Sequence, residues 1–249
     1  MLACVRRGAV RMHFHLPKPL HGWREFAGEV AIIVLGVLIA LAAEQMVERF
    51  SWNERAKAAQ QAMSKELLWD DGPEVYQRAA LHDCLQSKLD QIRAAVEANQ
   101  PRRQIASLTA GSQLYFLSYD SLAHDAANAS GVFEHMPAAD VEKWTNAYSM
   151  IPFMDRTAAR EAADIAHLQA LRRTGGPLSD PERDRLIDAV ETVRNDEASM
   201  WSGTRWTLPS IFQLNGELDP SRMRRFMTYA REHYGSCVKD VPRTWRGAT

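Results

Sequence analysis

The sequence predicts an all-α protein in which one N-terminal transmembrane helix continues into a helical, bundle-like extracytoplasmic domain. Three observations predict this fold class. The chain has one uninterrupted apolar run, from Val30 to Ala43, that water would solvate poorly. After it, apolar residues recur at spacings of three and four, the helical period, and glycine and proline divide this pattern into helix-sized pieces. No stretch alternates convincingly as a β-strand would, and no repeat has a fixed period.

The apolar run is short for a span, but its flanks extend it. As a helix it rises about 21 Å, against a hydrocarbon core of about 30 Å. Aromatic residues lie on both sides, and a helix from Trp23 to Trp52 covers about 43 Å, close to the roughly 40 to 45 Å of a bilayer with its headgroups. Phe26 and Phe50 strengthen the two flanks. We therefore expect an interface-to-interface transmembrane helix over residues 23–52.

A cleaved signal peptide is the main alternative for this segment. Ala40, Leu41 and Ala42 supply the small residues that a signal peptidase recognises. However, the region before the run is long, Glu29 directly precedes the run, and the residues after it favour continued helix where cleavage needs an extended chain. We expect an uncleaved signal anchor, whereas a native protein that begins at Ala43 would show cleavage.

The distribution of basic residues predicts the orientation. More of them precede the span than follow it, so the positive-inside rule places the N-terminus in the cytoplasm. They are Arg6, Arg7, Arg11, Lys18 and Arg24 before the span, and Arg49, Arg55 and Lys57 after it. We expect a single-pass protein of a bacterial inner membrane, with a cytoplasmic tail (1–22), the span (23–52), a helical periplasmic domain (53–240) and a C-terminal tail (241–249).

The helical pattern continues directly after the span. Apolar residues spaced three and four apart run from Trp52 to Leu67, so the same helix should reach about Trp69. Asp71-Gly72-Pro73 is typical of a helix end. A second helix should then run from the proline to about Asn99. We expect these two helices to form an antiparallel hairpin.

Four further helical segments are expected in the rest of the chain. Proline explains their boundaries, because it removes a backbone donor inside a helix but suits the first turn, especially beside a capping side chain. The segments are 107–128, 138–173 with an interruption near Pro152, one that begins at Ser179-Asp180-Pro181-Glu182, and one from Asp219-Pro220 to about Tyr234-Gly235.

Three patches around the span resemble one bacterial family. They are Trp23-Arg24-Glu25-Phe26, the apolar run that Glu29 opens, and Glu48 followed by Trp52-Asn53-Glu54-Arg55. They resemble a family of single-span inner-membrane proteins, a domain of unknown function with a Glu-led Ile/Val/Leu-Gly-Val-Leu-Ile-Ala-Leu span and a Trp-Asn-Glu patch. The resemblance covers residues 23–68, with a looser match over 126–148, and departs from the family at Ala43-Glu44-Gln45, where members carry Gln and Asn. It implies a membrane-anchored helical protein and no activity.

Glu29 is the sharpest single feature of the span. A carboxylate at the edge of a span is costly unless it reaches headgroup water, finds a partner or is protonated. One interpretation is a residue that extends into the interface. The other is a packing seam with Gly36, Ala40 and Ala43, which share roughly one helix face and whose small side chains let two spans approach closely.

The three cysteines divide by compartment. Cys4 would lie in the reducing cytoplasm, which leaves Cys84 and Cys237 together in an oxidising space. A bond between them would tie the second helix to the C-terminal segment and stabilise the fold by about 4 to 5 kcal/mol in the chain-entropy model. Two unpaired thiols are the alternative.

The sequence predicts a non-enzymatic protein without cofactor or metal. It has no His-Glu-x-x-His, Cys-x-x-Cys, phosphate-binding glycine loop or Gly-x-Ser-x-Gly. His82, His124 beside Asp125, and Glu134-His135 are better explained as helix-surface or capping groups than as metal ligands, since the helical spacing of a second ligand is missing. The formal net charge of -1 and the scattered arginine pairs give no reason to expect nucleic acid.

An aromatic-rich stretch, 201–215, is the least regular part of the pattern. Its Trp201, Trp206 and Phe212 are our candidates for a cleft or a partner surface, with core packing as the alternative. Two functions follow as expectations. The first is a membrane-anchored scaffold that binds another envelope protein or a second copy of itself. The second is a ligand-sensing domain that signals through its span to a separate output protein, because the N-terminal tail has no room for an output domain.

Overall fold

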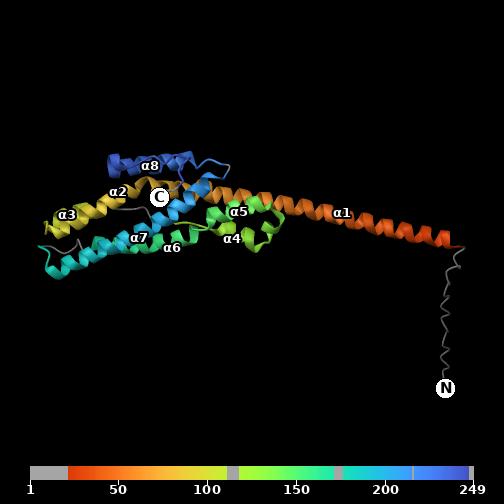
Figure 1. Cartoon of the computed structure of the whole chain (residues 1–249), viewed down its shortest axis with the longest axis horizontal. Helices are drawn as coiled ribbons and strands as arrows, with labels where there is room; N and C mark the ends of the chain where they lie inside the picture. The colour runs from red at the N-terminus through yellow and green to blue at the C-terminus, as the bar shows by residue number, and fades with distance from the viewer. Residues whose placement is uncertain (1–21, 111–117, 171–175, 215, 247–249) are drawn as a thin grey trace, which may run out of the picture. The chain divides into compact units, whose positions relative to one another are not determined.

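The computed structural model describes residues 22–110, 118–170, 176–214 and 216–246, and every element within them is helical, which confirms the predicted fold class (Figure 1). The chain forms two compact units, Met1–Ser51 and Trp52–Thr249. The elements are α1 (Trp23–Ser64), the π-helix η1 (Lys65–Asp71), α2 (Gly72–Glu97), α3 (Arg102–Ala110), α4 (Leu122–Ala129), the 3₁₀ turn η2 (Val132–His135), α5 (Ala138–Tyr148), α6 (Ile151–Ala170), α7 (Asp180–Phe212), α8 (Pro220–Tyr234) and the 3₁₀ turn η4 (Gly235–Cys237).

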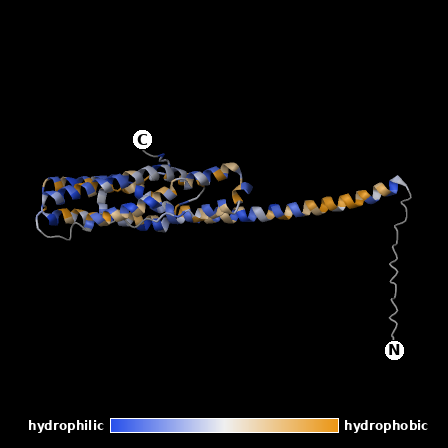
Figure 2. Ribbon diagram, turned by 90° about the horizontal axis from the view of Figure 1, so that it is seen from below, coloured by the Kyte–Doolittle hydropathy of each residue, from blue (hydrophilic) through white to orange (hydrophobic). Residues whose placement is uncertain are grey.

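The N-terminal part of α1 is a helix without a packed face. All of its residues from Trp23 to Ser51 are exposed, including the apolar ones such as Ile32 and Leu38. Figure 2 shows this stretch as the longest hydrophobic run of the ribbon. A helix that is apolar all round is stable only where something other than water surrounds it. By length and composition, α1 suffices to cross a membrane, as a span or as a signal anchor.

The expected hairpin after the span is wrong. The chain does not turn at Asp71-Gly72-Pro73 but passes from α1 through η1 into α2, so helical backbone continues to Glu97. A π-helical turn explains this result. Its i→i+5 bonds interrupt the regular ladder just before Pro73, which stands in the first turn of α2, where its missing N–H costs little.

Gly72 occupies this junction for a steric reason. A Cβ at this position would meet the carbonyl oxygen of Leu67 and approach Leu218 Cδ2 to 2.5 Å. A glycine is therefore required by the close approach of the π-turn and the segment before α8.

The helical domain is built on α2, α6 and α7. Helix α7 packs along both α2 and α6, and α8 packs against α2 (Figure 1). The largest apolar cluster joins α1, η1 and α2 to α5, α6 and the C-terminal half of α7, and a second one joins the C-terminal half of α2 to α3, α6 and the start of α7. Fully buried members include Met63, Leu67, Ile92, Ile151, Met154, Val190, Met200 and Leu208.

The helix starts agree with the capping signals. Helix α7 begins at Asp180, where Glu182 accepts the Ser179 backbone N–H at 2.9 Å, and α8 begins at Pro220 behind Asp219. The break between α5 and α6 falls just before Pro152. The expected helix over 107–128 is only partly formed: α3 ends at Ala110, α4 starts at Leu122, and 111–117 lie outside the described residues, as do 171–173 of the next segment.

Residues 201–212 are not irregular. They are the end of α7, which passes through the buried Pro209 without a break. Tertiary packing overrides the local signal here, since the apolar face of this stretch, with Leu208 and Ile211, is buried in the main cluster.

Candidate functional site

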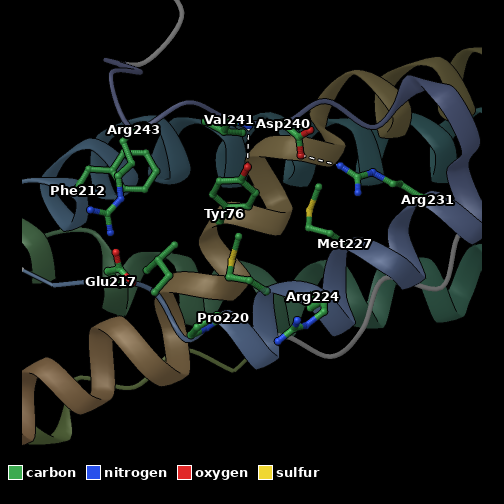
Figure 3. Close-up of a pocket in the computed structure, with 12 residues that line it drawn as sticks. Tyr76, Phe212, Glu217, Pro220, Arg224, Met227, Arg231, Asp240, Val241 and Arg243 are labelled. Carbon is green, nitrogen blue, oxygen red and sulfur yellow. Dashed lines mark hydrogen bonds and ion pairs between the residues drawn. The ribbon is translucent and has the colours of Figure 1, made fainter.

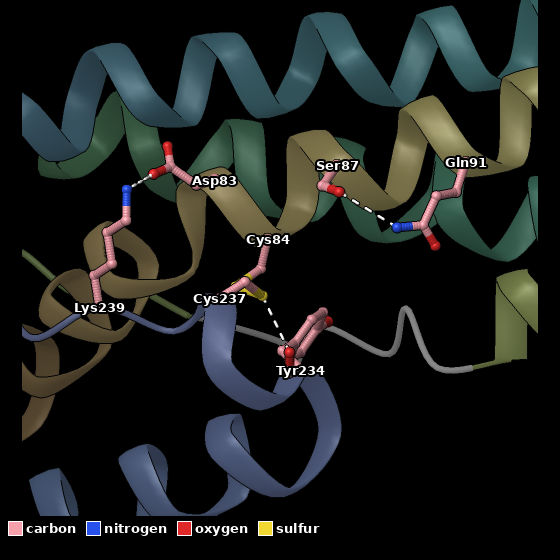
Figure 4. The surroundings of a disulfide bond; sticks show 7 residues. All are labelled: Asp83, Cys84, Ser87, Gln91, Tyr234, Cys237 and Lys239. Carbon is pink, nitrogen blue, oxygen red and sulfur yellow. Dashed lines mark hydrogen bonds and ion pairs between the residues drawn. A yellow bond between two sulfur atoms is a disulfide. The ribbon is translucent and has the colours of Figure 1, made fainter.

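The residues after the η4 turn form a non-helical strap, 238–246, which contains a turn at 243–244 and crosses the helical domain. Its first anchor is the disulfide between Cys84 on α2 and Cys237, whose Cα atoms lie 5.5 Å apart (Figure 4). Two hydrogen bonds donated by the strap backbone follow. Lys239 N–H donates to Ala80 O at 3.1 Å, and Val241 N–H donates to Tyr76 Oη at 2.9 Å. The strap therefore runs along α2 and is held at several points.

Charged side chains add three further anchors to the strap. Lys239 Nζ pairs with Asp83 on α2, and Arg231 on α8 pairs with Asp240 at 2.7 Å. Arg243 Nη2 donates to Gly216 O at 2.7 Å. The charged side chains in these contacts are exposed, so each contact contributes little to stability on its own. Together with the disulfide, they hold the strap in one position.

The strap borders two hollows, and Asp240 and Val241 line both of them. The first, which we call the His82 cavity, has a volume of about 490 Å³ and lies between α2, α7 and the strap. Its lining residues are Ala79, Ala80, His82, Asp83, Trp201, Arg205, Lys239, Asp240, Val241, Pro242 and Trp245.

His82 is held rigidly in the wall of this cavity. Its Nδ1 lies 3.1 Å from Glu197 Oε1, and its ring stacks on Trp201 at 3.9 Å between centroids, with 6° between the planes. Trp245 from the strap also contacts Trp201, with 5.8 Å between the ring centroids and 51° between the planes. Glu197 itself is buried and also accepts Gln86 Nε2 at 2.7 Å.

Arg78 stands behind His82 in the core. It is 1% exposed, donates through Nη2 to Glu161 at 2.5 Å, and has Glu197 at 4.0 Å. Burial disfavours its charge, but the two carboxylates more than compensate and raise the pKa of Arg78 above its usual range. Burial alone would raise the pKa of Glu197 too, but the His82 hydrogen bond and the Arg78 charge lower it. Burial raises the pKa of Glu161 despite Arg78.

The second hollow, which we call the α8 groove, is an open depression of about 640 Å³ between α8, the start of α2 and the strap (Figure 3). Its floor is apolar and its rim is charged. The floor residues are Tyr76, Phe212, Leu218, Pro220, Met223, Met227 and Val241, and the rim residues are Glu217, Arg224, Arg231, Asp240 and Arg243.

The structure separates the three aromatic residues that the sequence grouped as one cleft. Trp201 lines the His82 cavity, whereas Phe212 lines the α8 groove. Trp206 lines neither hollow and is 65% exposed. Trp201 and Arg205 are one helical turn apart on α7 and both line the His82 cavity. Trp206, on the same helix, does not line it.

The remaining sequence predictions fall outside these hollows. Glu29, Gly36, Ala40 and Ala43 lie on the exposed part of α1, and a Cβ at Gly36 would meet nothing within 4 Å, so the packing seam stays a prediction. His135 stacks on Trp52 at 3.9 Å, and His124 stacks on Tyr148. Within the described ranges, no three His, Cys, Asp or Glu residues gather as they would around a metal ion.

The buried Arg78, Glu161 and Glu197 were missed by the sequence reasoning, although a signal existed. Each lies on the apolar stripe of its helix, at a spacing of three or four from buried residues such as Val75 on α2 and Val193 on α7. A charged residue at a core position of the helical pattern is destabilising unless it has a buried counter-charge, so such a residue predicts a buried ion pair.

Acidic residues gather around one buried carboxylate, Asp71, at the junction of η1 and α2. Asp71 is 3% exposed and accepts Asp120 N–H at 3.2 Å. Burial raises the pKa of Asp71 to about 8; the Asp120 hydrogen bond opposes this rise, and the nearby Glu74 and Glu66 add to it. Burial likewise raises the pKa of Glu74 to about 7, although the positive charge of Arg222 lowers it.

We expect the domain to lose stability as the pH rises from about 4 to about 8. In this range the folded protein keeps protons on Asp71 and Glu74 that the unfolded chain has released. Unfolding therefore releases protons, and the free energy of unfolding falls as the pH increases. Asp71→Asn keeps an acceptor for Asp120 N–H without the charge, so it should raise the Tm at pH 8 and leave it nearly unchanged at pH 4.

Thermal unfolding followed by circular dichroism across this range measures the effect. Asp184→Asn changes an exposed carboxylate on α7 and should leave the pH dependence as it is. The same pH slope in Asp71→Asn and in the natural sequence would contradict the interpretation.

No family model, curated protein or solved structure matches this chain. The resemblance of the span to a family of inner-membrane proteins thus stays a prediction.

Proposed function

We propose that this chain is a non-enzymatic scaffold of the bacterial envelope. In this proposal α1 anchors it in the inner membrane with its N-terminus in the cytoplasm, and the helical domain binds another envelope protein in the periplasm. The single observation that carries the partner-binding role is the α8 groove, an open apolar depression with a basic helix at its edge.

Two features support the location. The exposed apolar surface of α1 suits a bilayer, and Cys84–Cys237 suits an oxidising compartment, which lies on the far side of the inner membrane. Both features fit the orientation that the basic residues before the span predict.

The chemistry of the groove favours an acidic, amphipathic segment as its occupant. Helix α8 carries four arginines (Arg222, Arg224, Arg225 and Arg231) against one carboxylate, Glu232, in a chain whose net charge is -1. Arg224 at the rim makes no hydrogen bond or ion pair with any described residue. A partner that places carboxylates over this rim and apolar side chains on the floor would be complementary in charge and in polarity.

The floor of the groove is suited to such a partner. Met223 is partly exposed and Met227, one turn further along α8, is buried; within α8 only Met227 and Ala230 are buried. Methionine side chains are flexible and polarisable, so they adapt to the shape of an incoming apolar residue. The shallow packing of α8 leaves the rest of its apolar face for contact.

Photocrosslinking in intact cells tests this proposal. A photoreactive residue in place of Met223 should give an adduct with one envelope protein, and mass spectrometry should locate the link in a segment rich in Asp and Glu. Arg224→Glu in the same chain should reduce this adduct at least roughly fivefold, because it puts a like charge against the partner's carboxylates.

The matched control is a photoreactive residue in place of Ala166, an exposed position on α6 outside both hollows. The same adduct from Ala166, or an adduct at Met223 that Arg224→Glu leaves unchanged, would overturn the groove as the partner site. An adduct with a second copy of the chain would replace the acidic partner by self-association.

A second function, recognition of a small ligand by the periplasmic domain, is favoured by the His82 cavity. Its volume of about 490 Å³ lies in the range of small-molecule sites, and convergent polar groups line it. Such a protein would pass the signal to a separate output protein.

A further inference from the structure

We propose that the His82 cavity binds a small organic acid with one carboxylate and an aromatic or other flat apolar body. This inference rests on the second function above, ligand recognition, and is independent of partner binding in the α8 groove. It follows from three features: a preformed wall, one uncompensated cation, and an aromatic surface.

The wall of the cavity is set before any ligand arrives. His82 is fixed from behind by Glu197 at 3.1 Å and from the side by the stacked Trp201 at 3.9 Å. Glu197 is fixed in turn by Gln86 at 2.7 Å. Because Nδ1 of His82 faces this carboxylate, Nε2 is the ring nitrogen left for a ligand. On the opposite side the disulfide to Cys84 holds the strap in place. A rigid site avoids the entropy cost of ordering side chains around the ligand.

The charges around the cavity leave one cation without a partner. Lys239 is neutralised by Asp83, and Asp240 is neutralised by Arg231, which lies outside the cavity. Arg205 remains, and it makes no hydrogen bond or ion pair with any described residue. A guanidinium of this kind binds a carboxylate through two parallel hydrogen bonds.

The single unpaired arginine, next to two carboxylates that already have partners, favours a ligand with one negative charge. A dianion such as a phosphate monoester would bring a second negative charge next to Asp83 and Asp240 without a second unpaired cation to meet it. A neutral amide of the same shape would offer the guanidinium one carbonyl acceptor but no negative charge, and an amine would meet Arg205 as a like charge.

The remaining surface of the cavity is apolar and flat. Trp245 and Pro242 come from the strap, Trp201 from α7, and Ala79 from α2. Indole and proline rings present broad faces on which a planar ring can stack. An aromatic acid would thus place its ring on this surface and its carboxylate at Arg205.

Ligand-observed NMR titration of the full-length protein in nanodiscs tests the inference. The probes are phenylacetate and 1-naphthylacetate, with phenylacetamide and 1-naphthylacetamide as neutral matches and phenyl phosphate as the dianion. We expect at least one acid to bind roughly tenfold or more tightly than its amide, since a hydrogen-bonded ion pair at a partly enclosed site contributes this much. Phenyl phosphate should bind more weakly than phenylacetate.

Arg205→Gln should reduce the affinity for the acid roughly tenfold and leave the affinity for the amide unchanged. The control is Arg156→Gln, which removes an exposed arginine on α6 that likewise has no partner among the described residues. It should change neither affinity. Both variants alter one exposed side chain, so unfolding does not complicate the comparison.

The outcomes separate the class of ligand from ligand recognition itself. If acid and amide bind equally and Arg205→Gln changes nothing, the carboxylate assignment is wrong while ligand recognition survives. If no probe binds up to about 10 mM, the proposal of an aromatic acid as the ligand of this cavity is overturned, whereas recognition of a ligand of another class is a separate question. Tighter binding of phenyl phosphate than of phenylacetate would overturn the selection of a monoanion.

Discussion

Arg78→Met should lower the free energy of unfolding by about 3 to 5 kcal/mol. Arg78 is buried, and its guanidinium compensates the charges of Glu161 and Glu197, which are also buried. Removing the cation leaves carboxylates in the core without their counter-charge, and this is far more costly than removing a whole ion pair. Urea unfolding of the full-length protein in detergent, followed by circular dichroism, measures the loss.

The matched control lies on the same helix. Arg93 also contacts two carboxylates, Glu97 at 2.8 Å and Glu191 at 2.7 Å, but these three side chains are 37–50% exposed and not buried. Arg93→Met should therefore cost less than about 1 kcal/mol. Adding Glu161→Gln to Arg78→Met should recover part of the stability, because it removes one of the two stranded charges. Equal losses in Arg78→Met and Arg93→Met would show that burial does not govern the effect.

Loss of the disulfide should lower the stability by a similar amount, about 4 to 5 kcal/mol in the chain-entropy model. Cys84 and Cys237 are 153 residues apart in sequence, so the bond closes a very long loop and strongly restricts the unfolded chain. The double variant Cys84→Ala/Cys237→Ala should unfold at lower urea concentration than the natural sequence.

Reductant supplies the control for this prediction. It should shift the unfolding midpoint of the natural sequence and of Cys4→Ala, but not that of the double variant. A midpoint that is the same in all three proteins, with and without reductant, would contradict a stabilising bond.

Thiol labelling in intact cells connects the same bond to the proposed location. In an oxidising periplasm, Cys84 and Cys237 should react with a maleimide only after reduction and denaturation. Reaction of both cysteines after denaturation alone would place the domain in a reducing compartment and overturn the periplasmic assignment.

Much of the architecture could be predicted from local patterns. The apolar N-terminal helix follows from one apolar run and its aromatic flanks, and the starts of α7 and α8 follow from Ser179 and Asp219 before their prolines. These features depend on neighbours within a few residues, so the sequence contains the information they need. The predicted hairpin at Asp71-Gly72-Pro73 was wrong because that prediction also rested only on neighbouring residues. A local breaker signal does not reveal that a π-turn and the packing of Gly72 carry the helix onward.

The hollows could not be predicted in this way. Trp201 and Phe212 are eleven positions apart on one helix, yet they line different hollows, both of which the strap borders. The pairing of Cys84 with Cys237 was one of two open alternatives until the distance between them was known. The buried charged residues were only partly predictable. The position of Arg78 on an apolar stripe predicts a buried counter-charge but does not tell which residue provides it.

By itself, then, the sequence determined that this protein is helical, that its N-terminal helix is apolar enough to cross a membrane, and where most of its helices begin. These properties depend on composition and on short-range periodicity. Only the tertiary structure decided that Glu197 contacts His82, that Arg205 lines a cavity without an ion pair to any residue in the described ranges, and that the strap from the C-terminal end of the chain lines the same cavity. Such properties arise from contacts between residues more than a hundred positions apart, and local patterns do not encode which distant residues will meet.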